Sequence, residues 1–479
     1  MRRSFYAFFA SVFVGILLIL VFVIHKKTAL FSEPNKKHDV VRYEKGYRFD
    51  QNGWIYVHIE GKPYERGFQH GRLLAPEIQK ILKNTKELVY LNTGMTWQFF
   101  VSAAERLFVW HLDKEFLEEM QGIADGASSP DNVITRQDIL VWNAYIELLY
   151  YWWPTKGKKA VTGDGDKDHC SAFIATGAAT KDGSVVMAHN TWTPFELGQN
   201  FNLILDLKPE RGFRIFMQSA PGCISSVTDF FLTSAGIIGT ETTIGDFNVY
   251  NEKGSPTFLR IRRAMQYAHN LDEVVAIMLK ANSGGYANTW LLADITTHEI
   301  MQFELGLKYY HVERKKDGYF IGVNLALDPR IRNLECSEKT GFANIKDSEG
   351  ARYVRLTQLM GKYYGKLDTK IAQNILADHY DVYLNKENPC TRTIEAHYEL
   401  DDCRYTDRKP FKPQGAVDGK VVDSGMAKKM SFFARWGNSS GMPFNAKKFI
   451  AQHIQWNYLA PYLENRPTQP WTLFTASTI

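Results

Sequence analysis

The sequence predicts an α+β fold in which two β-sheets pack face to face and helices cover both outer faces, an αββα sandwich. Three observations lead to this prediction. An alternating strand pattern at 54–59 comes first, a mainly helical region at 76–153 follows, and strand-like runs then dominate from Cys170 to about residue 325. Strands, then helices, then more strands suggest two sheets with helices packed outside them.

The composition indicates one packed globular protein. Among 479 residues, 45% are hydrophobic and 14% are aromatic, which argues against disorder and allows a large core. The formal net charge is only +5 and the basic residues are scattered, so we expect no nucleic-acid partner.

The first 27 residues are typical of a signal peptide or a membrane anchor. Arg2 and Arg3 precede an apolar run at 5–24, which is long enough for a bilayer-spanning helix. No small-x-small cleavage site follows, which favours an uncleaved anchor through which the protein contacts the membrane. In either case we expect the rest of the chain to be exported, whether secreted, periplasmic or in a lysosome-like lumen. Residues 28–50 are polar and charged, and they predict a linker.

The segment 51–169 is expected to be mainly helical. Gly67-Phe68-Gln69-His70-Gly71 leads into a helix with apolar residues at helical spacing. The aromatic residues of this region are expected in the core, and the alternative is that they line a hydrophobic pocket. The segment ends with a charged, glycine-containing loop at 156–169, which we expect to be exposed and therefore suitable for cleavage of the peptide chain.

The remainder, 170–479, is expected to alternate strands and helices. Strands are expected at 171–176, 184–188, 203–207, 213–218, 236–240, 290–294 and 300–304, and helices at about 257–269, 272–281, 350–363 and 368–377. The tail from Phe432 mixes aromatic segments with loops.

Cys170 begins the first of these strands. Lys181-Asp182-Gly183 predicts a hairpin turn, and the second strand ends in His189-Asn190. Pairing of the two strands would bring this polar cluster toward the thiol, and a thiol near an imidazole and an amide donor can perform nucleophilic acyl chemistry. A buried, inert cysteine is the alternative.

Two further segments combine polar side chains with strand ends. One includes Glu241 and Thr242, and the other, at 282–290, includes Asn288. Asparagine at a strand edge can donate hydrogen bonds to a developing oxyanion, although each segment alone is also typical of a simple turn. No Cys-x-x-Cys or His-x-x-His pair is present, so we expect no metal site and no cofactor.

Several blocks in this order resemble the phospholipase B-like family, a branch of the N-terminal nucleophile (Ntn) hydrolases. The chain is similar, more distantly, to penicillin acyltransferase and to bile-salt hydrolases. The resemblance covers most of the chain after the linker, and it rests on residues 67–71, 170–172, 188–192, 240–244, 282–288, 415–421 and 436–444.

The resemblance implies that the chain cuts itself between His169 and Cys170. The freed α-amine of Cys170 would take the thiol proton, and the thiolate would attack an acyl carbonyl to give a thioester that water resolves. The cut would separate a small chain, 51–169, from the catalytic part, 170–479. The two chains are expected to stay together, because the first is rich in buried-type residues.

The resemblance also suggests roles for individual residues. His189 would orient the nucleophile or assist proton transfer, with a core histidine as the alternative. Asn288 would stabilise the oxyanion, with Thr242 or its backbone N–H as the second donor. Glu241 would help hold the amine, and Asn190 would serve as a scaffold. Asp418, Lys420 and Arg435 are weaker candidates, with solvated surface charges as the alternative.

The expected function is hydrolysis of an acyl ester or amide bond in a lipid-like substrate through Cys170. Two alternatives remain. One is an acyltransferase or N-acyl amide amidohydrolase of the penicillin acyltransferase type, acting on an N-acyl small molecule. The other is a non-enzymatic exported protein with the same fold.

Overall fold

The computed structural model describes residues 39–156, 170–227, 230–337, 344–402, 404 and 409–476. The predicted signal or anchor at 1–27, and His169, lie outside these ranges. Over the described ranges, no helix is both long enough and apolar enough to cross a membrane. Residues Val41–Ile479 form one compact unit, so a cut before Cys170 would divide one packed body instead of separating two domains.

The larger sheet has ten strands and draws on both sides of Cys170. Its order is β1 (Val41–Tyr43), β2 (Gly46–Gln51), β3 (Trp54–Gly61), β6 (Leu203–Pro209), β7 (Ile215–Ser219), β8 (Phe231–Thr233), β9 (Ile237–Thr243), β10 (Asn288–Asp294), β11 (Glu299–Leu305) and β12 (Tyr310–Lys315). Strand β3 pairs in parallel with β6, and the other neighbours are antiparallel. The predicted linker is therefore wrong for residues 41–50, where Tyr47 is buried and the charged neighbours lie outward.

The smaller sheet has seven strands and carries Cys170. Its order is β13 (Gly318–Gly322), β4 (Cys170–Gly177), β5 (Gly183–Pro194), β17 (Asp418–Asp423), β18 (Ser431–Trp436) and β19 (Thr472–Thr475), with β16 (Gln414–Ala416) also paired to β5. The predicted β4–β5 hairpin is confirmed, with Cys170 opposite Thr191. Strand β5 runs longer than predicted because its last residues pair with β16. A separate short hairpin joins β14 (Tyr380–Asp381) and β15 (Lys386–Glu387).

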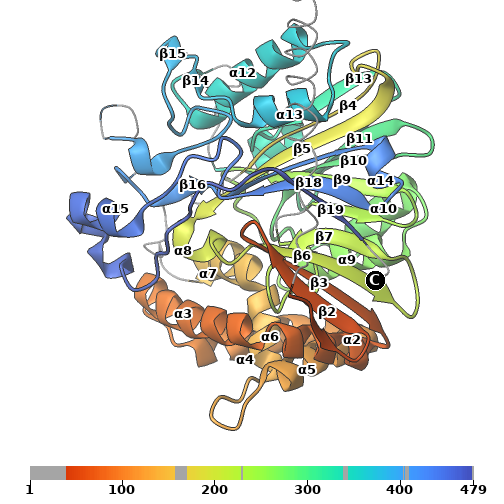
Figure 1. Ribbon diagram of the computed structural model, residues 1–479, viewed down its shortest axis with the longest axis vertical. Helices are drawn as coiled ribbons and strands as arrows, with labels where there is room; N and C mark the ends of the chain where they lie inside the picture. Colours follow the sequence, from red (N-terminus) through yellow and green to blue (C-terminus); the bar gives the residue numbers. More distant parts are fainter. Residues whose placement is uncertain are drawn as a thin grey trace, which may run out of the picture. The chain divides into compact units, whose positions relative to one another are not determined.

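The two sheets share a core between them. Tyr56, Ile204 and Phe216 of the larger sheet pack in the same cluster as Ile174 and Met187 of the smaller one. The longer helices cover the outer faces (Figure 1). On the larger sheet these are α2 (Pro63–Leu73), α3 (Ala75–Thr93), α4 (Trp97–Phe108), α5 (Lys114–Ala127), α6 (Arg136–Asn143), α9 (Thr257–Tyr267) and α10 (Leu271–Leu279), and on the smaller sheet α12 (Ser348–Lys362) and α13 (Thr369–Leu376). A mixed α and β fold built on two sheets is thus confirmed.

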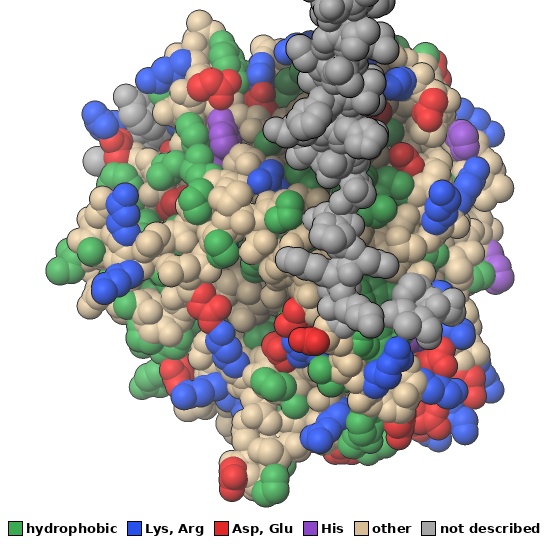
Figure 2. Space-filling view, viewed as in Figure 1, with side chains coloured by type: hydrophobic (Ala, Val, Ile, Leu, Met, Phe, Trp, Pro, Cys, Tyr) green, Lys and Arg blue, Asp and Glu red, His purple; other side chains and the backbone are tan. Residues whose placement is uncertain are grey.

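Short helices connect these elements: α7 (Trp153–Lys156), α8 (Phe195–Gly198), α11 (Pro329–Leu334), α14 (Ser424–Ala427), α15 (Ala446–Gln452), the 3₁₀ turns η1 (Val109–His111), η3 (Tyr398–Leu400) and η4 (Ile454–Leu459), and the π-helical segment η2 (Glu147–Trp152). On the face shown in Figure 2, basic side chains are interspersed with acidic ones, which agrees with the small net charge.

Helices α2 and α5 touch through their backbones. Gly67 and Gly71 on α2 face Gly122 and Gly126 on α5. A Cβ atom at Gly67 would lie 2.1 Å from the carbonyl oxygen of Glu119, and one at Gly122 would lie 2.3 Å from that of Tyr64. The glycines of the 67–71 block are therefore required for close helix packing.

His70, in the same block, is a buried hydrogen-bond acceptor. Its Nε2 accepts the backbone N–H of Gly222 at 2.8 Å, which joins α2 to the segment after β7. Burial, only partly offset by the negative charge of Glu119, lowers the pKa of His70 to about 4. The imidazole is therefore neutral in the folded protein at neutral pH.

This shift predicts a loss of stability in mild acid. The unfolded chain takes up a proton on His70 below about pH 6.5, whereas the folded chain does so only near about pH 4. The contribution of His70 to stability is complete above about pH 6.5, and about 2 kcal/mol of it should be lost between about pH 7 and about pH 4.5. Denaturant unfolding of the wild type and of His70→Gln at both pH values would measure this loss. The exposed His311→Gln is the control, and an equal pH dependence in wild type and His70→Gln would contradict the prediction.

Candidate active site at the start of strand β4

Both backbone groups of Cys170 are held by side chains from elsewhere in the chain. Its N–H donates to Oδ1 of Asn324 at 3.2 Å, and its carbonyl oxygen accepts from Nη1 of Arg352 at 2.7 Å. Cys170 itself is buried. The first residue of β4 is therefore fixed in place by an amide and a guanidinium group.

Asn324 and Arg352 also contact each other. Nη2 of Arg352 donates to Oδ1 of Asn324 at 3.1 Å, and Nδ2 of Asn324 donates to the carbonyl oxygen of Thr243 at 2.8 Å. The guanidinium group of Arg352 lies 4.1 Å from the ring centroid of Trp192, within cation–π distance. This network joins β4, β5, α12 and the end of β9 at one point.

Neither Asn324 nor Arg352 was among the predicted site residues. Arg352 lies in a correctly predicted helix, but helical spacing does not reveal that its side chain is fully buried against Cys170. Asn324 follows β13 with φ of 69°, a backbone conformation that asparagine adopts more readily than most residues. An asparagine just after a strand is a common turn signal, so it would not have been singled out.

A small cavity opens beside Cys170, with a volume of about 50 Å³. Its walls include Thr191, Glu241, Thr243 and Tyr286. The segment before Cys170 supplies further wall residues, namely Ile146, Tyr150 and Tyr151. Of the predicted site residues, Cys170 and Glu241 line this cavity. The aromatic region expected mainly in the core thus also forms a pocket wall.

Glu241 is the centre of a hydrogen-bonded group on the larger sheet. Its Oε1 accepts the hydroxyl of Tyr286 at 2.8 Å. With the amide of Asn288 oriented so that its nitrogen faces acceptors, Nδ2 donates to Oε2 of Glu241 at 2.7 Å and to the carbonyl oxygen of Ala287 at 2.9 Å. Both amide hydrogens of Asn288 are then engaged, so donation to an oxyanion would require one of these bonds to open.

Thr242 and Thr243 lie on opposite faces of β9. Thr243 lines the cavity, whereas Thr242 faces the smaller sheet, where a Cβ at Gly322 would lie 2.7 Å from its hydroxyl oxygen. The hydroxyl of Thr242, which was predicted with its backbone N–H as alternatives for the second oxyanion donor, therefore packs between the sheets, and the neighbouring Thr243 is the threonine at the cavity.

His189 lies deeper in the space between the sheets. It is paired with Ala172, two residues along β5 from the Thr191–Cys170 pair, which corresponds to about 7 Å. The imidazole is fully buried, its ring nitrogens make no side-chain hydrogen bond within the described ranges, and the backbone of Glu241 lies close enough to interact with the ring. Burial and the nearby positive charge of Lys420 hold the pKa of His189 well below its usual value, so the ring is neutral.

Lys420 and Asp418 form a fully buried ion pair, with Nζ and Oδ1 2.8 Å apart. The alternative of solvated surface charges is therefore wrong for both. Lys420 also donates to Oγ1 of Thr191 at 2.6 Å, and Oδ2 of Asp418 accepts from Nε2 of Gln218 at 2.7 Å. Because Thr191 pairs with Cys170, this charged pair lies next to the strand position that carries the thiol.

Asn190 points to the opposite face of the smaller sheet. Its Nδ2 donates to the carbonyl oxygens of Leu376 and Ile394, and its Oδ1 accepts from the hydroxyl of Ser439 at 2.5 Å. These contacts join β5 to the end of α13 and to the segments that carry Ile394 and Ser439, which is the kind of contact expected of a scaffold residue.

The sequence of this chain is similar to those of several known proteins. The family described as Phospholipase B matches residues 51–320. An uncharacterized protein of Archaeoglobus fulgidus is 29% identical over 262 residues, which cover 52% of this chain and 43% of that protein. Phospholipase B of Crotalus adamanteus is 25% identical over 299 residues, covering 56% and 51%. Phospholipase B-like 1 of Homo sapiens is 24% identical over 325 residues, covering 62% and 57%.

The chain thus spans about half the length of the curated relatives it matches. Among solved structures, a mutant of conjugated bile acid hydrolase from Clostridium perfringens matches with a TM-score of 0.34 and 11% identity, covering 56% of this chain and 89% of that chain. The segment matched to the family contains Cys170, Glu241 and Asn288, whereas Asn324 and Arg352 follow it.

Proposed function

Because this chain belongs to the phospholipase B family, we propose that it is a hydrolase of carboxylic ester or amide bonds whose nucleophile is the thiol of Cys170. The main support is the hydrogen bond from the backbone nitrogen of Cys170 to Oδ1 of Asn324, at the edge of a cavity. This hydrogen bond holds the backbone nitrogen of Cys170 next to the thiol of the same residue. After cleavage that nitrogen becomes an α-amine, which can act as the base that accepts the thiol proton.

The proposed precursor cuts its own peptide bond between His169 and Cys170. The new α-amine, with an ordinary pKa of about 8, would take the thiol proton. Asn324 would orient this amine, and the positive charge of Arg352 would favour the thiolate. The thiolate then adds to the acyl carbonyl, the leaving group departs with the proton, and water hydrolyses the thioester to release the acid and restore the thiol.

The walls of the cavity support a lipid-like acyl substrate. A second cavity of about 250 Å³ shares Tyr150, Pro194 and Leu197 with the one at Cys170. Its lining combines apolar residues such as Leu88 and Leu149 with charged ones such as Glu196 and Lys409, so the space that continues away from the thiol has an apolar part and a charged part. The apolar part fits the hydrocarbon of a fatty acyl ester or of an N-acyl amide.

The sheet order supports the association of the two chains. The proposed cut leaves β1–β3 on the small chain and the other strands of the larger sheet on the catalytic chain. Strand β3 pairs with β6 in seven residue positions, from Ile55–Leu203 to Gly61–Pro209. We propose that these contacts keep the two chains together after the cut. Export of the protein, with membrane contact through residues 1–27, is also part of the proposal and rests on the apolar run at 5–24.

Intact mass and N-terminal sequencing of purified wild type and Cys170→Ala would test the nucleophile. We expect a new N-terminus at Cys170 in the wild type only, with both fragments eluting together in size-exclusion chromatography. Activity should fall by at least about 1000-fold in Cys170→Ala, because the remaining groups cannot form the thioester. The matched control is Cys336→Ala, at a partly exposed cysteine, which should behave as wild type.

Substrates should include a diacyl phospholipid and an N-acyl amide, each with and without an added amine. Release of free fatty acid without an amine would support a hydrolase, and acyl transfer to the amine would support the acyltransferase alternative. A wild-type chain that cleaves correctly yet hydrolyses neither substrate would contradict the proposed activity while leaving the self-cleavage intact.

A further inference from the structure

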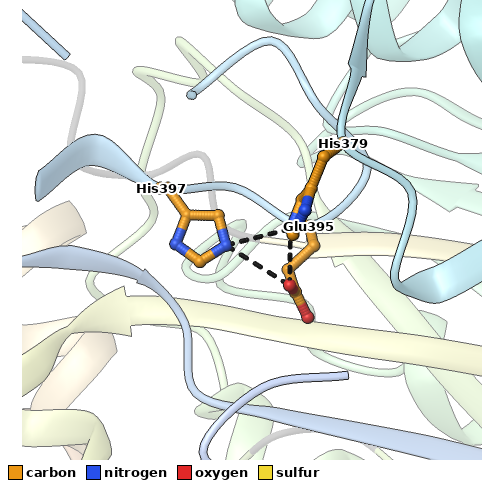
Figure 3. Close-up of side chains that lie close together, drawn as sticks. All are labelled: His379, Glu395 and His397. Carbon is orange, nitrogen blue, oxygen red and sulfur yellow. Dashed lines mark hydrogen bonds and ion pairs between the residues drawn. The ribbon is translucent and has the colours of Figure 1, made fainter. Parts of the chain in front are cut away.

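Two imidazoles and one carboxylate meet at a point outside the Cys170 cavity (Figure 3). Nε2 of His379 lies 2.6 Å from Oε2 of Glu395 and 3.1 Å from Nε2 of His397. Nε2 of His397 lies 3.3 Å from the same carboxylate oxygen. One ligand atom from each of three side chains therefore faces the same small volume.

The three residues come from two segments that the fold holds firmly. His379 follows α13, and Glu395 and His397 lie two residues apart in an extended segment before η3, so both point to the same side. His397 is bridged to Gly415 in the segment of β16, which pairs with β5. Glu395 and His397 are buried, and His379 is partly exposed, which leaves a path from solvent.

Neighbouring groups orient the inner atoms. Nδ1 of His397 lies 2.9 Å from Oε1 of Glu399, and Oε1 of Glu395 accepts the backbone N–H of Ser440 at 2.7 Å. When Nδ1 of His397 donates its proton to Glu399, its Nε2 presents a lone pair toward His379 and Glu395. A carboxylate behind the distal nitrogen of a histidine is the usual arrangement around metal-binding imidazoles.

Protons alone do not account for all three contacts. If His397 is neutral and donates to Glu399, only the proton on Nε2 of His379 is available for the two other atoms, which are both acceptors. If His397 is doubly protonated, it donates to Glu399 and Glu395 while His379 also donates to Glu395, and the 3.1 Å contact between the two Nε2 atoms then joins two donors. A cation at the point where they meet would interact with all three. Tetrahedral ligands bound at about 2.0 to 2.1 Å lie about 3.3 Å apart, so the distances of 2.6 to 3.3 Å require only small outward movements.

We propose that His379, Glu395 and His397 bind one divalent transition-metal ion of the zinc type, with a fourth position open to water. Nitrogen and carboxylate ligands in this combination suit Zn²⁺ better than Ca²⁺ or Mg²⁺, which prefer oxygen ligands. This departs from the sequence-based expectation of no metal site. The expectation rested on the absence of closely spaced cysteine or histidine pairs, whereas here a Glu-x-His pair is completed by His379, 16 residues before Glu395.

The ion would support the wall of the Cys170 cavity and take no part in the reaction. Ala396, between two of the ligands, packs with Tyr398 and Ala416 against Trp192. Trp192 lines the cavity and carries the guanidinium group of Arg352 on its ring. Binding of the ion would thus fix the segment behind this tryptophan.

The test uses the full-length protein, freed of metal by a chelator and then titrated with Zn²⁺ alone. Calorimetry and elemental analysis should give one Zn²⁺ per chain, and the wild type should melt at higher temperature with Zn²⁺ than without. His379→Ala and Glu395→Gln should each weaken binding by at least about 100-fold. The exposed His311→Ala is the matched control and should bind as the wild type does.

Because His379 is partly exposed, its replacement by alanine should leave the fold intact, and equal metal-free melting temperatures of wild type and His379→Ala would verify this. Absence of Zn²⁺ uptake by the wild type would overturn the proposal. Uptake that persists in His379→Ala but disappears in Cys170→Ala would also overturn it, since the ion would then sit at the thiol.

Discussion

Asn324→Gly is expected to lower the rate of acyl hydrolysis by about 100-fold or more, with a parallel loss of self-cleavage, and to leave the fold intact. The substitution removes the acceptor of the Cys170 backbone nitrogen and the link to Thr243. Glycine tolerates the φ of 69° at this position, so the change adds no backbone strain.

Asn385→Gly is the matched control for this variant. Asn385 is an exposed asparagine with a similar φ of 54°, remote in the chain from the cavity, and its replacement should leave the rate unchanged. Single-turnover kinetics on the cleaved enzyme would separate the effect on hydrolysis from the effect on maturation. An Asn324→Gly protein with wild-type turnover would show that the amine needs no acceptor at this point.

The companion substitution Arg352→Lys tests the same network from its charged side. Lysine retains the charge, but it cannot donate to the carbonyl of Cys170 and to Asn324 together or stack on Trp192 in the same way. A loss of turnover smaller than that of Asn324→Gly, with the pH profile preserved, is expected from a positioning residue.

The second large effect concerns the contact between α2 and α5. Gly67→Ala is expected to destabilise the protein by about 3 kcal/mol or more, because the new methyl group would lie 2.1 Å from a backbone oxygen of the facing helix. Elsewhere in a helix the same change is stabilising by up to about 1 kcal/mol.

Gly361→Ala provides the matched control, since Gly361 lies in α12 with no atom within 4 Å of its expected Cβ. Denaturant unfolding should therefore show opposite signs for the two alanine variants. If both variants were stabilised, the two helices would have room to separate and the close contact would not be required.

Much of the framework could be predicted from sequence because it follows from local patterns. The turn at Lys181-Asp182-Gly183 and the apolar runs on each side were sufficient to predict a hairpin that brings His189-Asn190 toward Cys170. In the structure Thr191 is the residue opposite Cys170, and His189 is paired with Ala172. The alternation of β9 did not reveal which of its faces borders the cavity, so Thr242 was chosen where Thr243 lines the wall.

The missed residues make their contacts through the tertiary fold. Arg352 reaches Cys170 across 182 residues of chain, and no periodicity records such a contact. Lys420 and Asp418 are charged, and isolated charges in a sequence are more often at the surface, but here each neutralises the other inside the protein. Residues 41–50 have a polar composition typical of a linker, yet pairing with β3 makes them strands.

The parallel pairing of β3 with β6 has a consequence for how a matured protein responds to denaturation. In the precursor the two strands belong to one molecule, so the free-energy cost of bringing them together does not depend on protein concentration. Once the peptide bond before Cys170 is broken, the two fragments separate on unfolding, and re-forming the sheet becomes a bimolecular step. The melting temperature of the cleaved form would then rise with protein concentration, while that of the uncut Cys170→Ala chain would not. Separated fragments would thus refold less readily than the uncut precursor folds. The lifetime of the folded, cleaved protein would then be set by its rate of unfolding.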